Sequence, residues 1–93
     1  MYKVRISEQV ESFLATLPPE PKHQLKTALA KLEHEQGNIK ALENELAGFS
    51  RLRVGRYRVV FCYVEPHTID CIFAEDRKLV YALFGALIRE HLG

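Results

Sequence analysis

Four arginines stand close together in the middle of this 93-residue chain, and their chemistry is the most specific signal in the sequence. Residues 49–64 contain four arginines and no Asp or Glu, so the segment carries a charge of +4, whereas the net charge of the whole chain is +1. A guanidinium group is planar, stays protonated and binds phosphate through two parallel hydrogen bonds. The segment is therefore a candidate phosphate-binding site, made by Arg51, Arg53, Arg56 and Arg58.

The arginines lie on two predicted strands joined by a tight turn. β-Branched and aromatic residues dominate segments 49–54 and 57–65, and Gly55-Arg56 between them suits a two-residue type II′ turn. That turn pairs residue i with residue 111 − i, so Arg53 lies opposite Arg58. Because side chains alternate between the faces of a sheet, Arg51 shares a face with these two. The other face is then wholly apolar and should receive the helices; it holds Leu52, Val54, Tyr57, Val59 and Phe61.

Like charges directly opposite each other destabilise a sheet, so the Arg53–Arg58 pair makes physical sense if an anion lies among the arginines. The alternative is that they are solvated surface residues whose stems cover apolar sheet. A second candidate pair is Arg77 and Tyr81, four residues apart, which would share one side of a helix. For this pair the alternative is that Tyr81 belongs to the core and that Arg77 pairs with Glu75 or caps an edge of the sheet.

The rest of the chain must position these groups, and its hydrophobic spacing predicts the order strand, two helices, three strands, helix. A strand over 2–6 precedes a helix that Ser7 can cap and that ends at Leu17 before a run of prolines. A second helix ends at the stop signal Gly37-Asn38. Residues 39–48 are predicted as a connector, with a short helical turn over 41–46.

The last third of the chain is predicted as a strand over 68–74 followed by a helix. Pro66 fits a tight turn poorly, so we expect a loop longer than two residues before this strand. The C-terminal helix has one apolar side, and Gly85 weakens it by about 1 kcal/mol relative to Ala, which predicts a short or kinked helix. The apolar side consists of Val80, Leu83, Phe84 and Leu87.

Length and composition limit the class of protein. With 93 residues, 47% of them hydrophobic, the chain is one domain with a core of its own. The longest apolar run, 79–88, has ten residues, whereas a membrane-spanning helix needs about 20, and the N-terminus lacks the apolar stretch of a secretory signal. We therefore expect a cytoplasmic protein in which Cys62 and Cys71 are buried free thiols. The cysteines and histidines show no metal-ligand spacing, so we expect no metal site and no cofactor.

The segment from Leu46 to Phe61 resembles the central signature of the RelE/ParE toxin superfamily, in which a basic strand leads through a Gly turn into a Tyr-Arg strand. The later string Asp76-Arg77-Lys78-Leu79-Val80-Tyr81 is similar to the family's terminal segment, and the element order also matches. The resemblance covers residues 1–93. It implies an α+β, RelE-like (microbial-ribonuclease-like) fold, in which a curved antiparallel sheet has two N-terminal helices packed on one face.

The resemblance also implies the toxin of a type II toxin–antitoxin pair. RelE-type members cut mRNA in the ribosomal A site by attack of the RNA 2′-hydroxyl on the adjacent phosphate, a step that needs no metal. Arginines would stabilise the charge of the transition state, and a tyrosine would stack on a base or accept the 2′-hydroxyl proton. By position, the catalytic residues are Arg53, Arg58, Arg77 and Tyr81, and the RNA contacts are Arg51, Arg56 and Lys78. The implied partners are a cognate antitoxin with an acidic segment, mRNA and the ribosome.

Departures from the family pattern keep other functions open. Asp76 stands where many relatives carry His, and together with Glu75 it would compete with phosphate for Arg77. The net charge of +1 is low for a protein that enters a ribosome. The alternative is a ParE-like inhibitor of DNA gyrase without nuclease activity, and a third option is an interaction domain without toxicity.

Overall fold

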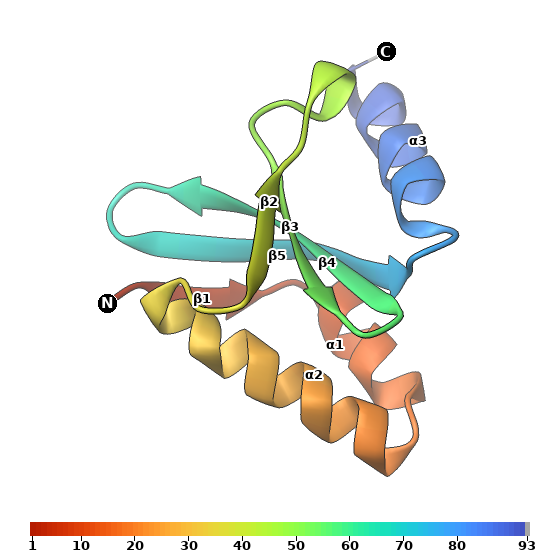
Figure 1. Cartoon of the computed structure of the whole chain (residues 1–93). Helices are drawn as coiled ribbons and strands as arrows, with labels where there is room; N and C mark the ends of the chain where they lie inside the picture. Colours follow the sequence, from red (N-terminus) through yellow and green to blue (C-terminus); the bar gives the residue numbers. More distant parts are fainter. Residues whose placement is uncertain (93) are drawn as a thin grey trace.

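A five-stranded sheet lies between two N-terminal helices on one face and a C-terminal helix on the other (Figure 1). The computed structural model describes residues 1–92. The strands lie in the order β1-β5-β4-β3-β2. Along the chain the elements are β1 (Lys3–Ile6), α1 (Glu8–Thr16), α2 (Pro19–Lys31), η1 (Leu32–His34), β2 (Asn38–Ala41), η2 (Asn44–Leu46), β3 (Ser50–Val54), β4 (Tyr57–Val64), β5 (Thr68–Asp76) and α3 (Val80–Leu92).

The two N-terminal helices begin and end close to the predicted positions. The Ser7 hydroxyl oxygen accepts a hydrogen bond from the Val10 N–H at 3.2 Å, which confirms the predicted cap of α1. Leu17 has an extended backbone and ends this helix before the prolines. The second helix ends earlier than predicted: Glu35 follows the 3₁₀ turn η1 in the left-handed region, with a φ of 53°.

The prediction of a connector over residues 39–48 is wrong in its first part, because Asn38–Ala41 forms strand β2. This strand pairs antiparallel with β3, and Lys40 lies opposite Arg51. Asn, Lys and Ala are poor strand formers, so local propensity gives no sign of β2, and its pairing with β3 decides the conformation. The predicted helical turn is confirmed as the 3₁₀ turn η2.

The sheet is mixed, which corrects the expectation of an antiparallel one. β1 pairs with β5 in parallel, with Val4 opposite Ile69, while the other three pairings are antiparallel. A parallel pair requires a long crossover connection, and here the whole chain between the two strands supplies it. The direction of such a long-range pairing is not encoded in the local hydrophobic pattern.

The register of the central hairpin is as predicted. Arg53 pairs with Arg58 and Leu52 with Val59, and Gly55 in the turn has a φ of +58°, a backbone conformation that favours glycine. The next loop is longer than two residues, as expected, and spans residues 65–67. The arginine face and the helix-facing side of the hairpin are therefore both confirmed.

Two clusters of buried side chains lie on the two faces of the sheet. The helices α1 and α2 pack against Leu52, Val59 and Phe61, which confirms the predicted helix-facing side. On the opposite face, Val60 and Phe73 pack beneath α3. Apolar side chains therefore lie on both faces of the hairpin, because Val60, two residues after Arg58, shares the face of the arginines.

Helix α3 has thirteen residues and is not shortened at Gly85. Val80 and Phe84 are buried as predicted, but Leu83 and Leu87 are 43% and 39% exposed. The apolar side of the helix is therefore wider than the part that the sheet covers. Within residues 1–92, no helix is long and apolar enough to cross a membrane.

Candidate active site

A cavity of about 630 Å³ lies where β2, β3 and β4 meet the segment that leads into α3. Its lining contains five cationic side chains and a single carboxylate, so the formal charge of the lining is 5 − 1 = +4. The cations are Lys40, Arg51, Arg58, Arg77 and Lys78; Glu43, Tyr81, Ala41, Leu42, Asn44 and Leu46 complete the lining. Such a concentration of positive charge favours a polyanionic ligand.

The neighbouring strands β2 and β3 place Lys40 and Arg51 at the cavity. Lys40 on β2 lies opposite Arg51 on β3, so the two side chains project from the same face. The Arg51 guanidinium Nη1 donates to the main-chain and side-chain oxygens of Asn38, at 2.8 and 2.9 Å. Asn38 is therefore a support that holds Arg51 in place along β2.

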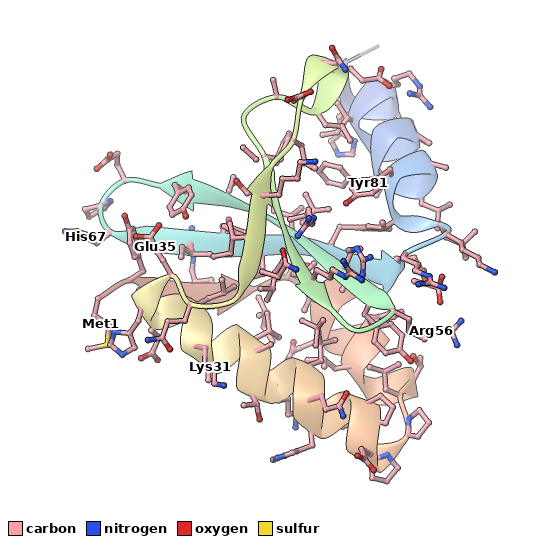
Figure 2. The ribbon with its side chains drawn as sticks, in the orientation of Figure 1. Met1, Lys31, Glu35, Arg56, His67 and Tyr81 are labelled. Carbon is pink, nitrogen blue, oxygen red and sulfur yellow. The ribbon has the colours of Figure 1, made fainter. Side chains whose placement is uncertain are left out.

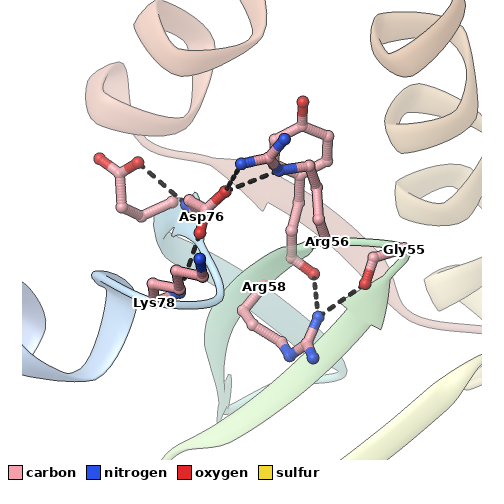
Figure 3. Close-up of polar contacts among 7 residues, drawn as sticks. Gly55, Arg56, Arg58, Asp76 and Lys78 are labelled. Atoms are coloured by element: carbon pink, nitrogen blue, oxygen red, sulfur yellow. Dashed lines mark hydrogen bonds and ion pairs between the residues drawn. The ribbon is translucent and has the colours of Figure 1, made fainter.

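Arg58, like Arg51, is a half-buried cation of the cavity. Its Nη1 donates to the Gly55 and Tyr57 carbonyl oxygens, both at 2.9 Å, so the guanidinium is tied to the β3–β4 turn (Figure 3). Burial lowers the pKa of Arg58, and the nearby positive charges of Arg53, Arg51 and Arg77 lower it further. An arginine nevertheless stays protonated at neutral pH, and a bound anion would relieve the repulsion.

Arg77 and Tyr81 reach the cavity from the β5–α3 region. Arg77 lies before the helix, so the premise that the two residues share a helical face is wrong, yet both side chains line the same cavity. Tyr81 is 38% exposed and is not a core residue; Figure 2 shows it on α3. Within residues 1–92 Arg77 has no ion-pair partner, and Glu75 instead accepts a hydrogen bond from the Asp76 N–H.

Two predicted residues lie away from this cavity. Arg53 lines a different groove, of about 360 Å³ between α2 and β3, although it pairs with Arg58. Arg56, expected to contact RNA, has its guanidinium on the Asp76 carboxylate, at 2.6 Å from Nη2 to Oδ2. Figure 2 shows Arg56 at the tip of the hairpin, well apart from Tyr81.

The sequence interpretation missed three polar residues of the lining: Lys40, Glu43 and Asn44. All three belong to the segment whose sequence predicts a connector. Glu43 is exposed, and within the described chain its carboxylate makes no ion pair and no side-chain cap. No signal in the local sequence marks them, because pairing of β2 with β3 brings them to the arginines.

The cavity lining contains no cysteine and no histidine. Among residues 1–92, no group of three or more His, Cys, Asp and Glu side chains is arranged to hold a metal ion. Both cysteines are free thiols; Cys71 is buried as predicted, while Cys62 is only half-buried, which corrects the second half of that prediction. Burial raises the pKa of the Cys71 thiol to about 12 and also raises that of Cys62.

Solved structures of toxins resemble this chain over nearly their whole length. The toxin–antitoxin complex RelBE2 from Mycobacterium tuberculosis contains a chain 28% identical to this one; the match covers 82% of this chain and 98% of that one, with a TM-score of 0.70. The chain has the RelE/ParE toxin fold. The resemblance to the RelE/ParE superfamily seen in the sequence is thereby confirmed.

Two further RelE/ParE structures agree with this fold. The RelB–RelE antitoxin–toxin complex from Methanococcus jannaschii matches at 20% identity over 85% of this chain and 96% of that one, with a TM-score of 0.66. The YoeB/ParE toxin from Agrobacterium tumefaciens matches at 12% identity over 80% and 96%, with a TM-score of 0.65. No protein-family profile matches the chain, and no curated protein matches its sequence.

Proposed function

We propose that this chain is the toxin of a type II toxin–antitoxin pair and that its cavity cleaves mRNA on the ribosome. The observation that carries the proposal is the convergence of Arg51, Arg58, Arg77 and Tyr81 on one cavity, in a chain whose fold matches the RelE/ParE toxins. A cytoplasmic location follows from this function.

The cavity contains the groups that transesterification of RNA requires. The 2′-oxygen attacks the adjacent phosphorus as its proton passes to a base of the cavity. The bond from phosphorus to the 5′-oxygen breaks and the 5′-oxygen takes a proton from water, so that the products are a 2′,3′-cyclic phosphate and a 5′-hydroxyl. The transition state places extra negative charge on the phosphoryl oxygens, and Arg51, Arg58 and Arg77 would stabilise that charge. The nucleophile and the leaving group are both part of the substrate, so proton transfer is the protein's other task.

The cavity offers two groups for the proton of the 2′-hydroxyl. Glu43 is the one carboxylate of the lining and Tyr81 is the one phenol. We assign the general base to Glu43, because an ionised carboxylate accepts a proton near neutral pH more readily than a phenol with an ordinary pKa of about 10. Tyr81 would then stack on a base of the message.

Primer extension on a translated message tests this function. We expect discrete cuts at the ribosomal A site with the wild-type protein and none with Arg58→Ala. An intact message together with gyrase-dependent DNA breaks would instead assign the ParE-like activity. The acidic pair beside Arg77 favours that alternative in the sequence, but in the structure the Asp76 carboxylate pairs with Arg56 and not with Arg77.

The proposal includes a cognate antitoxin whose acidic segment covers the arginine face. Strand pairing places Arg51, Arg53 and Arg58 on that face with no carboxylate between them. We expect the double variant Arg51→Glu, Arg58→Glu to bind the protein encoded by the neighbouring gene much more weakly than the wild type at moderate salt. Unchanged affinity would place the antitoxin elsewhere on the surface.

A further inference from the structure

The turn between β3 and β4 is connected to the β5–α3 segment by a charged pair. The Arg56 guanidinium meets one oxygen of the Asp76 carboxylate, with Nε at 2.7 Å and Nη2 at 2.6 Å from Oδ2 (Figure 3). The Arg56 side chain is 66% exposed, whereas that of Asp76 is 17% exposed. A hydrogen-bonded ion pair of this length is among the stronger polar contacts of a protein surface.

The same carboxylate organises the segment that carries Arg77. Its other oxygen accepts a hydrogen bond from the Lys78 N–H at 2.9 Å. The Asp76 carbonyl oxygen accepts from the Leu79 N–H at 2.9 Å, and the Arg77 N–H donates to the Arg56 carbonyl oxygen at 2.8 Å. Arg77 is therefore flanked by contacts that fix its backbone to the hairpin turn.

Arg58 is tied to the same turn from the other side. Its guanidinium donates to the Gly55 and Tyr57 carbonyl oxygens, and these two residues flank Arg56. The two cations, Arg58 and Arg77, thus come from different elements, and each is held to the Gly55–Tyr57 backbone. Their separation depends on this turn keeping its position relative to β5.

We propose that Arg56 and Asp76 are a positioning pair that sets Arg77 against Arg58, so that both guanidinium groups address one phosphate. The inference rests on the proposed function and deepens it, since it assigns Arg56 a role through Arg77 and not a contact with RNA. Charge stabilisation in a transition state depends on placement within a fraction of an ångström. Asp76 then supports phosphate binding by Arg77 instead of competing for it.

The variants Arg56→Met and Asp76→Asn test the pair. Each variant removes the ion pair. Arg56 is exposed and makes no core contact, so we expect Arg56→Met to fold. It therefore tests the pair even if Asp76→Asn does not fold. The matched control is Arg5→Met, which removes a cation from the ion pair between Arg5 and Asp70, 3.5 Å apart on the β1 side of the sheet. We expect each pair variant to lower the single-turnover cleavage rate about 10-fold to 100-fold, and the control to leave it unchanged.

The decisive comparison uses the Arg77→Ala background. If the pair acts through Arg77, neither Asp76→Asn nor Arg56→Met lowers the cleavage rate further in that background. With Arg77 present, the double variant Arg56→Met, Asp76→Asn should cleave at the same rate as either single variant. A loss of the same size with and without Arg77 would overturn the proposal, because the pair would then act only on general stability.

A second measurement keeps this test separate from the proposed function. Inorganic phosphate is titrated while the Nε–Hε resonances of Arg58 and Arg77 are followed by NMR. In the wild type and the Arg5→Met control we expect both resonances to shift with one common dissociation constant. In Arg56→Met we expect the Arg77 response to be lost and that of Arg58 to be retained. An unchanged Arg77 response would overturn the pair's role, whereas absent RNA cleavage with this NMR pattern would overturn the nuclease only.

Discussion

Arg53 and Arg58 lie directly opposite each other on β3 and β4, yet only Arg58 lines the cationic cavity. Arg53 borders the groove beside α2, and its charge still acts on Arg58, whose pKa it lowers after the larger effect of burial. The two arginines therefore share a face of the sheet without sharing a site. Arg58 is the catalytic candidate, and Arg53 affects it through space.

This difference predicts unequal losses of activity. We expect Arg58→Ala to lower the rate of message cleavage by about 100-fold to 1,000-fold, the range found when one transition-state donor is removed. Arg53→Ala should lower it less than about 10-fold, because its guanidinium is outside the cavity. Both rates come from single-turnover primer extension, with thermal melts as the control for folding. A larger loss for Arg53→Ala than for Arg58→Ala would contradict this assignment.

The assignment of Glu43 as general base predicts different losses of activity at Glu43 and Tyr81. Glu43→Gln should lower the cleavage rate about 100-fold or more, because an amide cannot accept the proton of the 2′-hydroxyl. Tyr81→Phe keeps the ring that would stack on a base, so it should lower the rate less than about 10-fold. The measurement is the single-turnover cleavage rate of all three proteins, with thermal melts as the control for folding. A larger loss for Tyr81→Phe than for Glu43→Gln would show that the base is Tyr81.

In the buried cluster beneath α3, we expect one aromatic side chain to hold the helix on the sheet. Phe84 is 2% exposed and contacts Phe49 and Phe73, at ring-centroid distances of 5.0 and 5.8 Å. We expect Phe84→Ala to lower the free energy of unfolding by about 3–5 kcal/mol, the usual cost of deleting a buried aromatic ring. Guanidinium denaturation measures this loss. Leu83→Ala, one position away and 43% exposed, is the matched control and should cost less than about 1 kcal/mol.

The raised pKa of Tyr63 predicts that the protein loses stability at alkaline pH as this phenol ionises. Tyr63 is 45% exposed, and the partial burial of its ring raises its pKa to about 12, aided by the hydrogen bond that its hydroxyl donates to Glu35 at 2.7 Å. A pKa raised on folding means that the protonated phenol stabilises the fold; this contribution is complete below pH 10 and is lost as the pH rises towards about 12. Absorbance at 295 nm follows the ionisation of the tyrosines.

In that titration Tyr63→Phe should remove the last tyrosine to ionise. Glu35→Gln should move this step to lower pH, because the neutral amide lacks the negative charge that opposes ionisation of the phenol. A last step that survives in Tyr63→Phe would show that another tyrosine is the one with the raised pKa.

Local rules sufficed for the parts of the chain that are close in sequence. Ser7, the prolines after Leu17 and the turn at Gly55 each act within a few residues, so the start and end of α1 and the register of the central hairpin were predictable. Strand alternation then placed Arg51, Arg53 and Arg58 on one face. The same rules could not find β2, whose residues have weak strand propensity and become a strand by pairing with β3.

Turn chemistry and side-chain alternation are local, so the hairpin and its arginine face follow from the sequence, as does the resemblance to RelE/ParE toxins. Which cations meet depends instead on the fold, which brings Lys40 and Glu43 to the cavity, leaves Arg53 beside α2 and pairs Arg56 with Asp76. These outcomes depend on contacts between distant segments, above all the pairing of β2 with β3 and the packing of α3 on Val60 and Phe73. The side-chain pattern of a segment indicates which of its faces is buried, but its strand propensity does not identify the distant strand with which it pairs.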